Sequence, residues 1–132
     1  IDQNVNYPYN PYMLASALLK PIEQARKVVH LASDKKASDI VILDIRELSD
    51  VTDYFVVLTG SSQRQIGSLV QDIEQELKEV GVTLHHREGT AGSSWRLLDY
   101  GDLVVHIFES SDRNFYDIEG MWSKAHEVVR IQ

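Results

Sequence analysis

Residues 54–81 read YFVVLTGSSQRQIGSLVQDIEQELKEVG, which contains the signals of a strand, a turn and a helix in succession. The run from Tyr54 to Thr59 is apolar and rich in β-branched and aromatic side chains, as in a strand buried on both faces. Gly60 interrupts this run, and Ser61 or Ser62 can cap the helix that follows. The stretch therefore indicates an α/β domain, in which helices cover a sheet.

The helix after these serines carries one continuous apolar stripe. Its apolar residues at helical spacing are Ile66, Leu69, Val70, Ile73, Leu77 and Val80. Gly81 is well placed to end the helix, because glycine readily adopts the left-handed conformation common at that position.

Further elements are expected on both sides of this unit. Upstream, residues 21–36 predict an amphipathic helix that begins at a proline, and residues 39–45 (DIVILDI) predict a second buried strand. Downstream, strands are expected at residues 82–87, 95–99 and 102–108. The last expected element is a helix at about residues 111–119.

The connections between these elements predict a mixed sheet. Tyr100 and Gly101 leave room only for a tight turn, so the strands on either side form an antiparallel hairpin. The strand–helix–strand unit over residues 54–87 is expected to pair in parallel through a right-handed crossover. The predicted fold is a single compact α/β domain over residues 13–132, with a mixed five-stranded sheet flanked by helices. Residues 1–12 are expected to form an irregular N-terminal arm.

Composition excludes several classes of protein. The chain has 132 residues, of which 43% are hydrophobic and 25% charged, and it contains no cysteine. These values exclude disorder along most of the chain and a scaffold held by disulfides. No apolar run reaches the roughly 20 residues that a membrane-spanning helix needs, so no membrane partner is expected.

The charge of the chain favours a basic partner. The net charge is −7, and residues 39–132 contain seventeen acidic but only eight basic side chains. Nucleic-acid binding depends largely on cations that neutralise phosphates, so an acidic domain is poorly suited to it. An acidic surface is better suited to a basic protein, since opposite fields speed encounter and disfavour wrong partners.

Three segments together resemble a known family. They are TDYFVVLTGSSQRQ (residues 52–65), WRLLDYGDLVVHIF (95–108) and RNFYDIEGMW (113–122). The strand segment DIVILDIREL (39–48) and the pair Glu88-Gly89 match as well. In this order and spacing, the segments are similar to the ribosomal silencing factor family, also called RsfS or Iojap-like.

The resemblance implies a fold and a function. The fold would be nucleotidyltransferase-like in architecture but without the catalytic residues, and no cofactor is expected. The function would be that of a translation repressor, which binds ribosomal protein fourteen on the large ribosomal subunit and sterically blocks joining of the small subunit when nutrients are scarce. Such a protein would work in a bacterial cytoplasm or in the stroma or matrix of an organelle. Homodimers are common in this family in isolation.

A candidate contact surface lies on the predicted hairpin. Aromatic side chains with charges beside them are typical of the residues that dominate protein interfaces. The candidate partner-binding residues are Trp95, Leu98, Asp99, Tyr100 and Asp102. Trp95 and Asp99 match the partner-facing segment of the family. Core packing of Trp95 and turn chemistry at Asp99 and Asp102 are the alternatives.

Strand geometry divides these candidates between two faces. Trp95, Leu97 and Asp99 share one face of the strand, whereas Arg96, Leu98 and Tyr100 share the other. One face must pack on a helix, so not all of these side chains can reach a partner. The sequence leaves open which face that is.

A metal-dependent nucleotidyltransferase-like enzyme is the alternative function. The turn at residues 60–62 resembles a phosphate-binding turn, and two-metal chemistry also needs converging carboxylates. Asp72 and Glu74 have the two-residue separation of such a pair, but inside a helix they point to different sides. Asp99 and Asp102 flank a tight turn instead. No catalytic residue is therefore expected.

Metal and RNA sites are also not expected. His85 and His86 are neighbours on a predicted strand and face opposite sides, and His106 lies on another strand. Without cysteine, the chain has no zinc framework. The few arginines are not interleaved with aromatic residues as a base-stacking platform requires, so little or no direct nucleic-acid binding is predicted.

Overall fold

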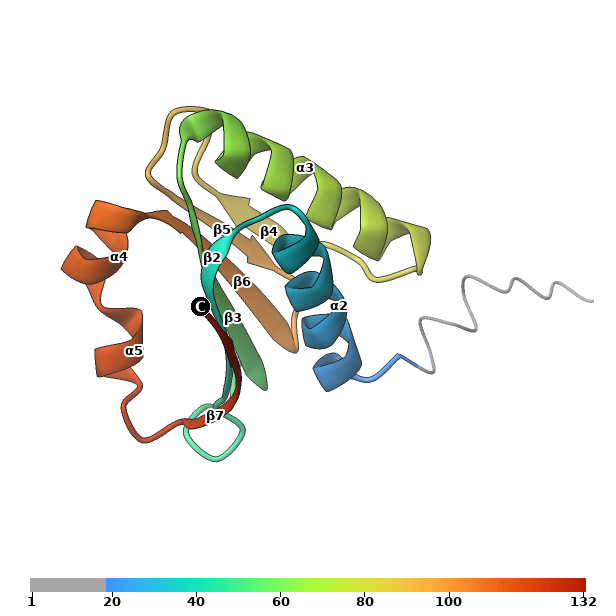
Figure 1. The fold of residues 1–132 in the computed structure, drawn as a ribbon. Helices are drawn as coiled ribbons and strands as arrows, with labels where there is room; N and C mark the ends of the chain where they lie inside the picture. Colours follow the sequence, from blue (N-terminus) through green and yellow to red (C-terminus); the bar gives the residue numbers. More distant parts are fainter. Residues whose placement is uncertain (1–18) are drawn as a thin grey trace, which may run out of the picture.

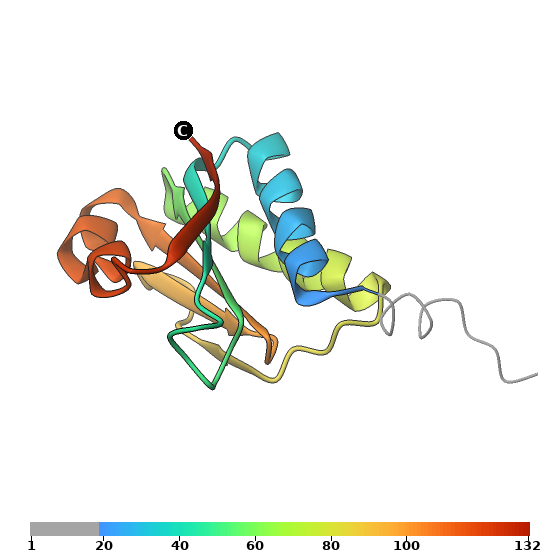
Figure 2. The same ribbon diagram turned by 90° about the horizontal axis from the view of Figure 1, so that it is seen from below.

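The structure, a computed structural model, describes residues 19–132 (Figures 1 and 2). The arm expected at residues 1–12, and the expected start of the domain at residue 13, lie outside the described residues. In chain order the elements are α2 (Pro21–Asp34), β2 (Ser38–Asp44), β3 (Tyr54–Gly60), α3 (Gln63–Glu79), β4 (His86–Glu88), β5 (Trp95–Asp99), β6 (Leu103–Glu109), α4 (Ser110–Tyr116), α5 (Ile118–Met121) and β7 (His126–Ile131).

The described residues form one mixed sheet between two layers of helices. The strand order is β4-β5-β6-β3-β2-β7, and all neighbours are antiparallel except β3 and β6. Helices α2 and α3 cover one face, and the short helices α4 and α5 lie over the other (Figures 1 and 2). The predicted α/β class and mixed sheet are confirmed, although the sheet has six strands rather than five. No helix in the described part is both long and apolar enough to cross a membrane.

The central strands are apolar without interruption because both of their faces are buried. On β3, Val56 and Leu58 pack in the core beneath α2 and α3, whereas Phe55 and Val57 pack on the opposite side. Side chains alternate between the two faces of a strand, so each of the two cores takes every second residue.

Helix α3 forms as its apolar stripe and caps predict. The Ser62 hydroxyl accepts a hydrogen bond from the Gln65 backbone N–H at 3.1 Å, which caps the first turn. The helix ends before Gly81, which has a φ of +81°. At the start of the helix, in the turn that leads from β3 into α3, a Cβ on Gly60 would lie 2.5 Å from Ile66 Cγ1. Only a glycine therefore allows the chain to leave β3 so close to the helix.

The parallel partner of β3 was wrongly predicted. Strand β3 pairs in parallel with β6, and β4 lies at the edge of the sheet with β5 and β6 between them. The strand expected at residues 82–87 is also shorter than predicted. The Val82 N–H bonds back to the Leu77 carbonyl at 2.9 Å to close the helix, and the chain first joins the sheet where the His85 N–H reaches the Asp99 carbonyl at 2.8 Å.

The end of the chain also differs from the prediction. Asp117 adopts a left-handed conformation with a φ of +49°, which divides the expected helix into α4 and α5. The Asp117 side chain then accepts from the Gly120 N–H, starting the second helix. Strand β7 was not expected, because its residues are mostly exposed and lack a clear apolar pattern. It pairs with β2 and forms the sixth strand.

Candidate functional site

Aromatic rings gather on the face of the sheet opposite α2 and α3, here called the second face. The Trp95 ring stacks on Phe108, with centroids 5.0 Å apart, and packs against Tyr116 of α4 at 4.5 Å. Farther along the same face, Phe55 meets the Trp122 ring edge-on at 5.3 Å. Such edge-to-face and stacked pairs hold the rings in defined orientations.

His106 lies at the centre of this aromatic group. It is only 4% exposed, and its Nδ1 accepts a hydrogen bond from Trp95 Nε1 at 3.1 Å. Burial lowers the pKa of His106 to about 4, so the ring is neutral near pH 7. Because Nδ1 is the acceptor, the single proton of the neutral ring is on Nε2.

A hollow of about 410 Å³ opens on the second face beside His106. Apolar side chains supply most of its lining, chiefly Phe55, Leu97, Val104 and Trp122. Carboxylates also line it: Asp99, and Glu88, whose Oε2 lies within hydrogen-bond distance of His86 Nε2 at 3.0 Å. The hollow thus combines an apolar lining with acidic groups, an arrangement that also occurs at the centres of protein interfaces.

Trp95 and Asp99 lie on this second face, as their shared strand position predicts, together with Leu97. Trp95 is half-buried against its aromatic neighbours, so packing accounts for part of its role. The Asp99 carboxylate accepts a hydrogen bond from the Gly101 N–H at 2.8 Å, so it also holds the turn. Asp102 follows in the same turn and is exposed.

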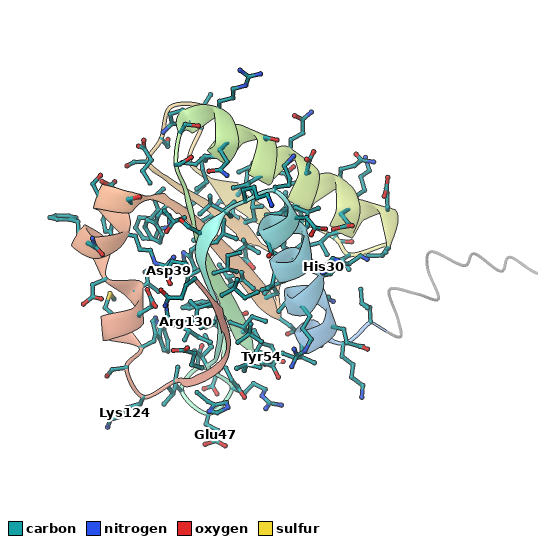
Figure 3. The ribbon with its side chains drawn as sticks, viewed as in Figure 1. His30, Asp39, Glu47, Tyr54, Lys124 and Arg130 are labelled. Atoms are coloured by element: carbon teal, nitrogen blue, oxygen red, sulfur yellow. The ribbon has the colours of Figure 1, made fainter. Side chains whose placement is uncertain are left out.

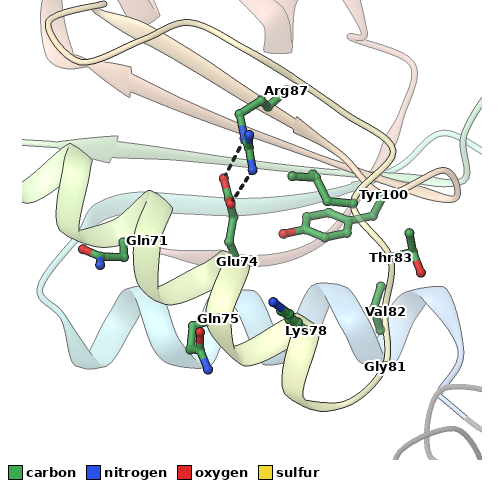
Figure 4. Close-up of a pocket in the computed structure, with 10 residues that line it drawn as sticks. Gln71, Glu74, Gln75, Lys78, Gly81, Val82, Thr83, Arg87 and Tyr100 are labelled. Atoms are coloured by element: carbon green, nitrogen blue, oxygen red, sulfur yellow. Dashed lines mark hydrogen bonds and ion pairs between the residues drawn. The ribbon is translucent and has the colours of Figure 1, made fainter.

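Leu98 and Tyr100 lie on the other face and do not fit a contact role. They are 1% and 6% exposed and pack in the core beneath α2 and α3. The Tyr100 ring lines a pocket between α3 and residues 81–87, and its hydroxyl has no hydrogen-bond partner (Figure 4). Burial raises the pKa of Tyr100. Leu98 and Tyr100 are not available to a partner, as the sequence predicted them to be, because α3 covers this side of the hairpin.

The acidic pair considered for metal chemistry is separated in the structure. Asp72 contacts Lys35, whereas Glu74 accepts two hydrogen bonds from Arg87, at 2.8 and 3.2 Å (Figure 4). The two carboxylates thus face different neighbours, as expected for positions two apart on a helix. Within residues 19–132, no three histidine, aspartate or glutamate side chains gather in a way that would hold a metal ion.

Arg113 is buried, although no local periodic pattern in the sequence indicates a role for it. Its Nε donates to Glu119 at 3.0 Å, and its Nη1 donates to the Thr59 hydroxyl at 2.9 Å and to the Asp39 carbonyl. Arg130 of β7 joins both Asp39 and Glu119, so these charges connect α4, α5 and β7 to the central strands (Figure 3 labels Asp39 and Arg130). The motif at residues 113–122 contains Arg113 and could have indicated a role for it. An arginine near a helix end usually lies at the surface, however, so the sequence does not predict its burial.

Comparison with known proteins points to one family. The family model described as ribosomal silencing factor during starvation matches residues 19–132. A ribosomal silencing factor from Bacillus subtilis is 37% identical over 92 residues, which span 70% of this chain and 78% of the relative. The chloroplastic protein Iojap of Zea mays is 33% identical over 124 residues, which span 92% of this chain and 53% of that protein.

A solved structure supports the same likeness. The crystal structure of a protein from Chromobacterium violaceum matches this fold with a TM-score of 0.76 at 34% sequence identity. The match covers 83% of this chain and 93% of that protein.

Proposed function

The chain belongs to the ribosomal silencing factor family, and we propose that it represses translation by binding ribosomal protein fourteen on the large ribosomal subunit. The names of its relatives describe a regulatory factor rather than an enzyme. The proposed mechanism is steric: the bound protein occupies the surface that the small subunit must reach. It would act where its ribosomes are, in a bacterial cytoplasm or in an organelle.

The second face of the sheet is the observation that supports this proposal most directly. It presents Trp95, Leu97 and Asp99, and the last two of these line an apolar hollow. Buried aromatic side chains around a pocket, with charged groups beside it, are the usual centre of a protein interface. Ribosomal proteins are basic, so the acidic groups complement them.

Co-sedimentation with purified large ribosomal subunits tests the proposal. We expect wild-type protein to sediment with the subunits, and Asp99→Arg and Trp95→Ala to bind about 30-fold more weakly, as is usual for central interface residues. Glu79→Arg is the matched control, because it makes the same charge change at an exposed position on α3. Thermal melts must show that each variant is folded. Equal binding by all variants would refute the site.

Subunit joining tests the mechanism separately. Large subunits incubated with the protein are expected to form fewer joined ribosomes when small subunits are added, as measured by light scattering. The Asp99→Arg variant should leave joining unchanged. Joining that proceeds normally with the wild-type protein bound would contradict the steric mechanism.

We also propose that the protein forms a homodimer when it is not on the ribosome. Near the helices α4 and α5, Phe115 is 79% and Met121 is 73% exposed. Large apolar side chains exposed to this degree are candidates for an interaction surface.

A further inference from the structure

The loop between β2 and β3, residues 45–53, carries an apolar side chain that lies almost wholly in solvent. This is Val51, which is 85% exposed, the largest fraction among the large apolar side chains of the described residues. A single apolar side chain at the surface is common and needs no explanation. Val51 is not isolated, however, because it lines the hollow of the second face together with Phe55, Leu97 and Trp122. It therefore extends the apolar lining of the hollow to the surface, where a partner can reach it.

Hydrogen bonds hold this loop against the turn of the β5–β6 hairpin. The Asp53 N–H donates to the Asp102 carbonyl in that turn at 3.1 Å. Within the loop, the Val51 N–H donates to the Ser49 hydroxyl at 3.0 Å. A loop that the fold already holds in place loses little conformational freedom when a partner binds, so ordering it costs little binding free energy.

The charges beside Val51 suit a basic partner. Glu47 and Asp50 are exposed on the same loop, and Asp102 is exposed in the turn to which the loop is bonded. The basic side chain of the loop, Arg46, already forms a 2.7 Å ion pair with a carboxylate of β2. An apolar side chain with carboxylates beside it complements a protein surface on which lysines or arginines flank an apolar side chain.

We propose that the β2–β3 loop is a second part of the partner-binding surface, in which Val51 packs against an apolar side chain of the ribosomal protein at the mouth of the hollow. Basic side chains of that protein lie beside Asp50 and Asp102. A second copy of this chain would bring its own acidic surface to the loop, so the charges favour the basic protein. This inference rests on the proposed function and adds to the hairpin a contact from a different segment of the chain.

The substitution Val51→Ser tests the proposal, because it removes an apolar contact without changing the core. At a position that is 85% exposed, the variant should melt at the wild-type temperature. Binding buries the valine, so its loss should raise the Kd for purified ribosomal protein fourteen about tenfold. Affinity equal to that of wild type would refute the contact.

Leu48→Ser is the matched control. Leu48 lies on the same loop and is also exposed, at 43%, but it does not line the hollow of the second face. We expect its affinity for ribosomal protein fourteen to remain that of wild type, in a sample that thermal melts show to be folded. Equal losses of affinity in Leu48→Ser and Val51→Ser would overturn the assignment of the contact to Val51.

Two comparisons separate this inference from the proposed function and from self-association. If Asp99→Arg loses binding while Val51→Ser does not, the proposed function stands and only the loop contact fails. If wild-type protein does not bind ribosomal protein fourteen, both fail. Sedimentation equilibrium of Val51→Ser should give the wild-type mass. A shift toward one chain, with unchanged affinity for ribosomal protein fourteen, would show that a second copy covers the loop and would overturn the proposal.

Discussion

At the scale of single residues, Arg113 carries the largest expected effect on stability. Its guanidinium is buried and hydrogen-bonded to Thr59, Asp39 and Glu119. Arg113→Leu leaves the Thr59 hydroxyl and the Asp39 carbonyl without their donor, at about 1–3 kcal/mol for each buried unpaired group, while Arg130 still pairs with Asp39 and Glu119. Chemical denaturation should therefore show a large loss in the free energy of unfolding.

Arg46→Leu is the control for this prediction. Arg46 pairs with Asp44 at the surface, where ion pairs contribute little. A loss in Arg113→Leu no larger than in Arg46→Leu would contradict the structural role of Arg113.

Because the pKa of His106 is lowered by burial, the free energy of unfolding should depend on pH. Its pKa is about 4 in the folded protein and about 6.5 when unfolded, so the unfolded state binds the proton more readily. The free energy of unfolding should consequently fall as the pH is lowered from 6.5 to 4, by at most about 3 kcal/mol from this residue.

Urea denaturation across this pH range checks the prediction. His106→Gln removes the titrating group, so the difference in stability between wild type and variant should shrink as the pH falls. A difference that stays constant between pH 4 and 6.5 would show that His106 is not a buried neutral histidine.

At the scale of elements, α3 depends on the cap at its start. The Ser62 hydroxyl accepts from the Gln65 N–H, and loss of such a cap costs about 1 kcal/mol. Ser62→Ala should lower the free energy of unfolding by that amount. Ser61→Ala is the comparison, because the Ser61 hydroxyl bonds the Gln65 side chain rather than a backbone N–H of the first turn. The stability of both variants can be measured by thermal or urea denaturation. Equal stability of Ser62→Ala and Ser61→Ala would contradict the assignment of the cap.

The edge strand β7 shows how an element depends on distant partners. Strand β7 adds to β2 at one edge, and its Arg130 connects it to Asp39 and Glu119. Within β7 itself, the two half-buried valines are the residues that favour a strand. The charge cluster and the unpaired edge of β2, rather than the sequence of β7, therefore explain why this segment becomes a strand.

At the scale of the whole molecule, the net charge of −7 predicts how binding responds to salt. Attraction between an acidic protein and a basic partner speeds encounter, and salt screens it. The association rate with ribosomal protein fourteen should fall as the ionic strength rises. Stopped-flow measurements should show a smaller dependence for Asp99→Asn, and a rate independent of salt would contradict an electrostatic contribution.

Self-association is also a property of the whole molecule. Sedimentation equilibrium at micromolar concentration should give the mass of two chains, about twice 15.0 kDa. Phe115→Ser should shift the mass toward one chain, because it removes a largely exposed aromatic ring. A single-chain mass for the wild-type protein would contradict the dimer.

Local sequence patterns are enough to predict the α/β class, the buried strands β2, β3 and β6, the helix α3 and its serine cap. They also predict that Trp95 and Asp99 share one strand face. These features depend on the spacing of apolar residues and on residues close together in the chain, so the sequence contains the information directly.

Local patterns do not predict which face of the hairpin α3 covers, and therefore do not predict that Leu98 and Tyr100 belong to the core. Only the tertiary structure decides this, and it also decides that β6 is the parallel neighbour of β3, and that Thr52 and His106, 54 positions apart, line one hollow. Contacts between distant segments depend on how the whole chain packs, because each local pattern is compatible with several neighbours. Periodicity identifies a buried residue, but it does not identify what that residue meets.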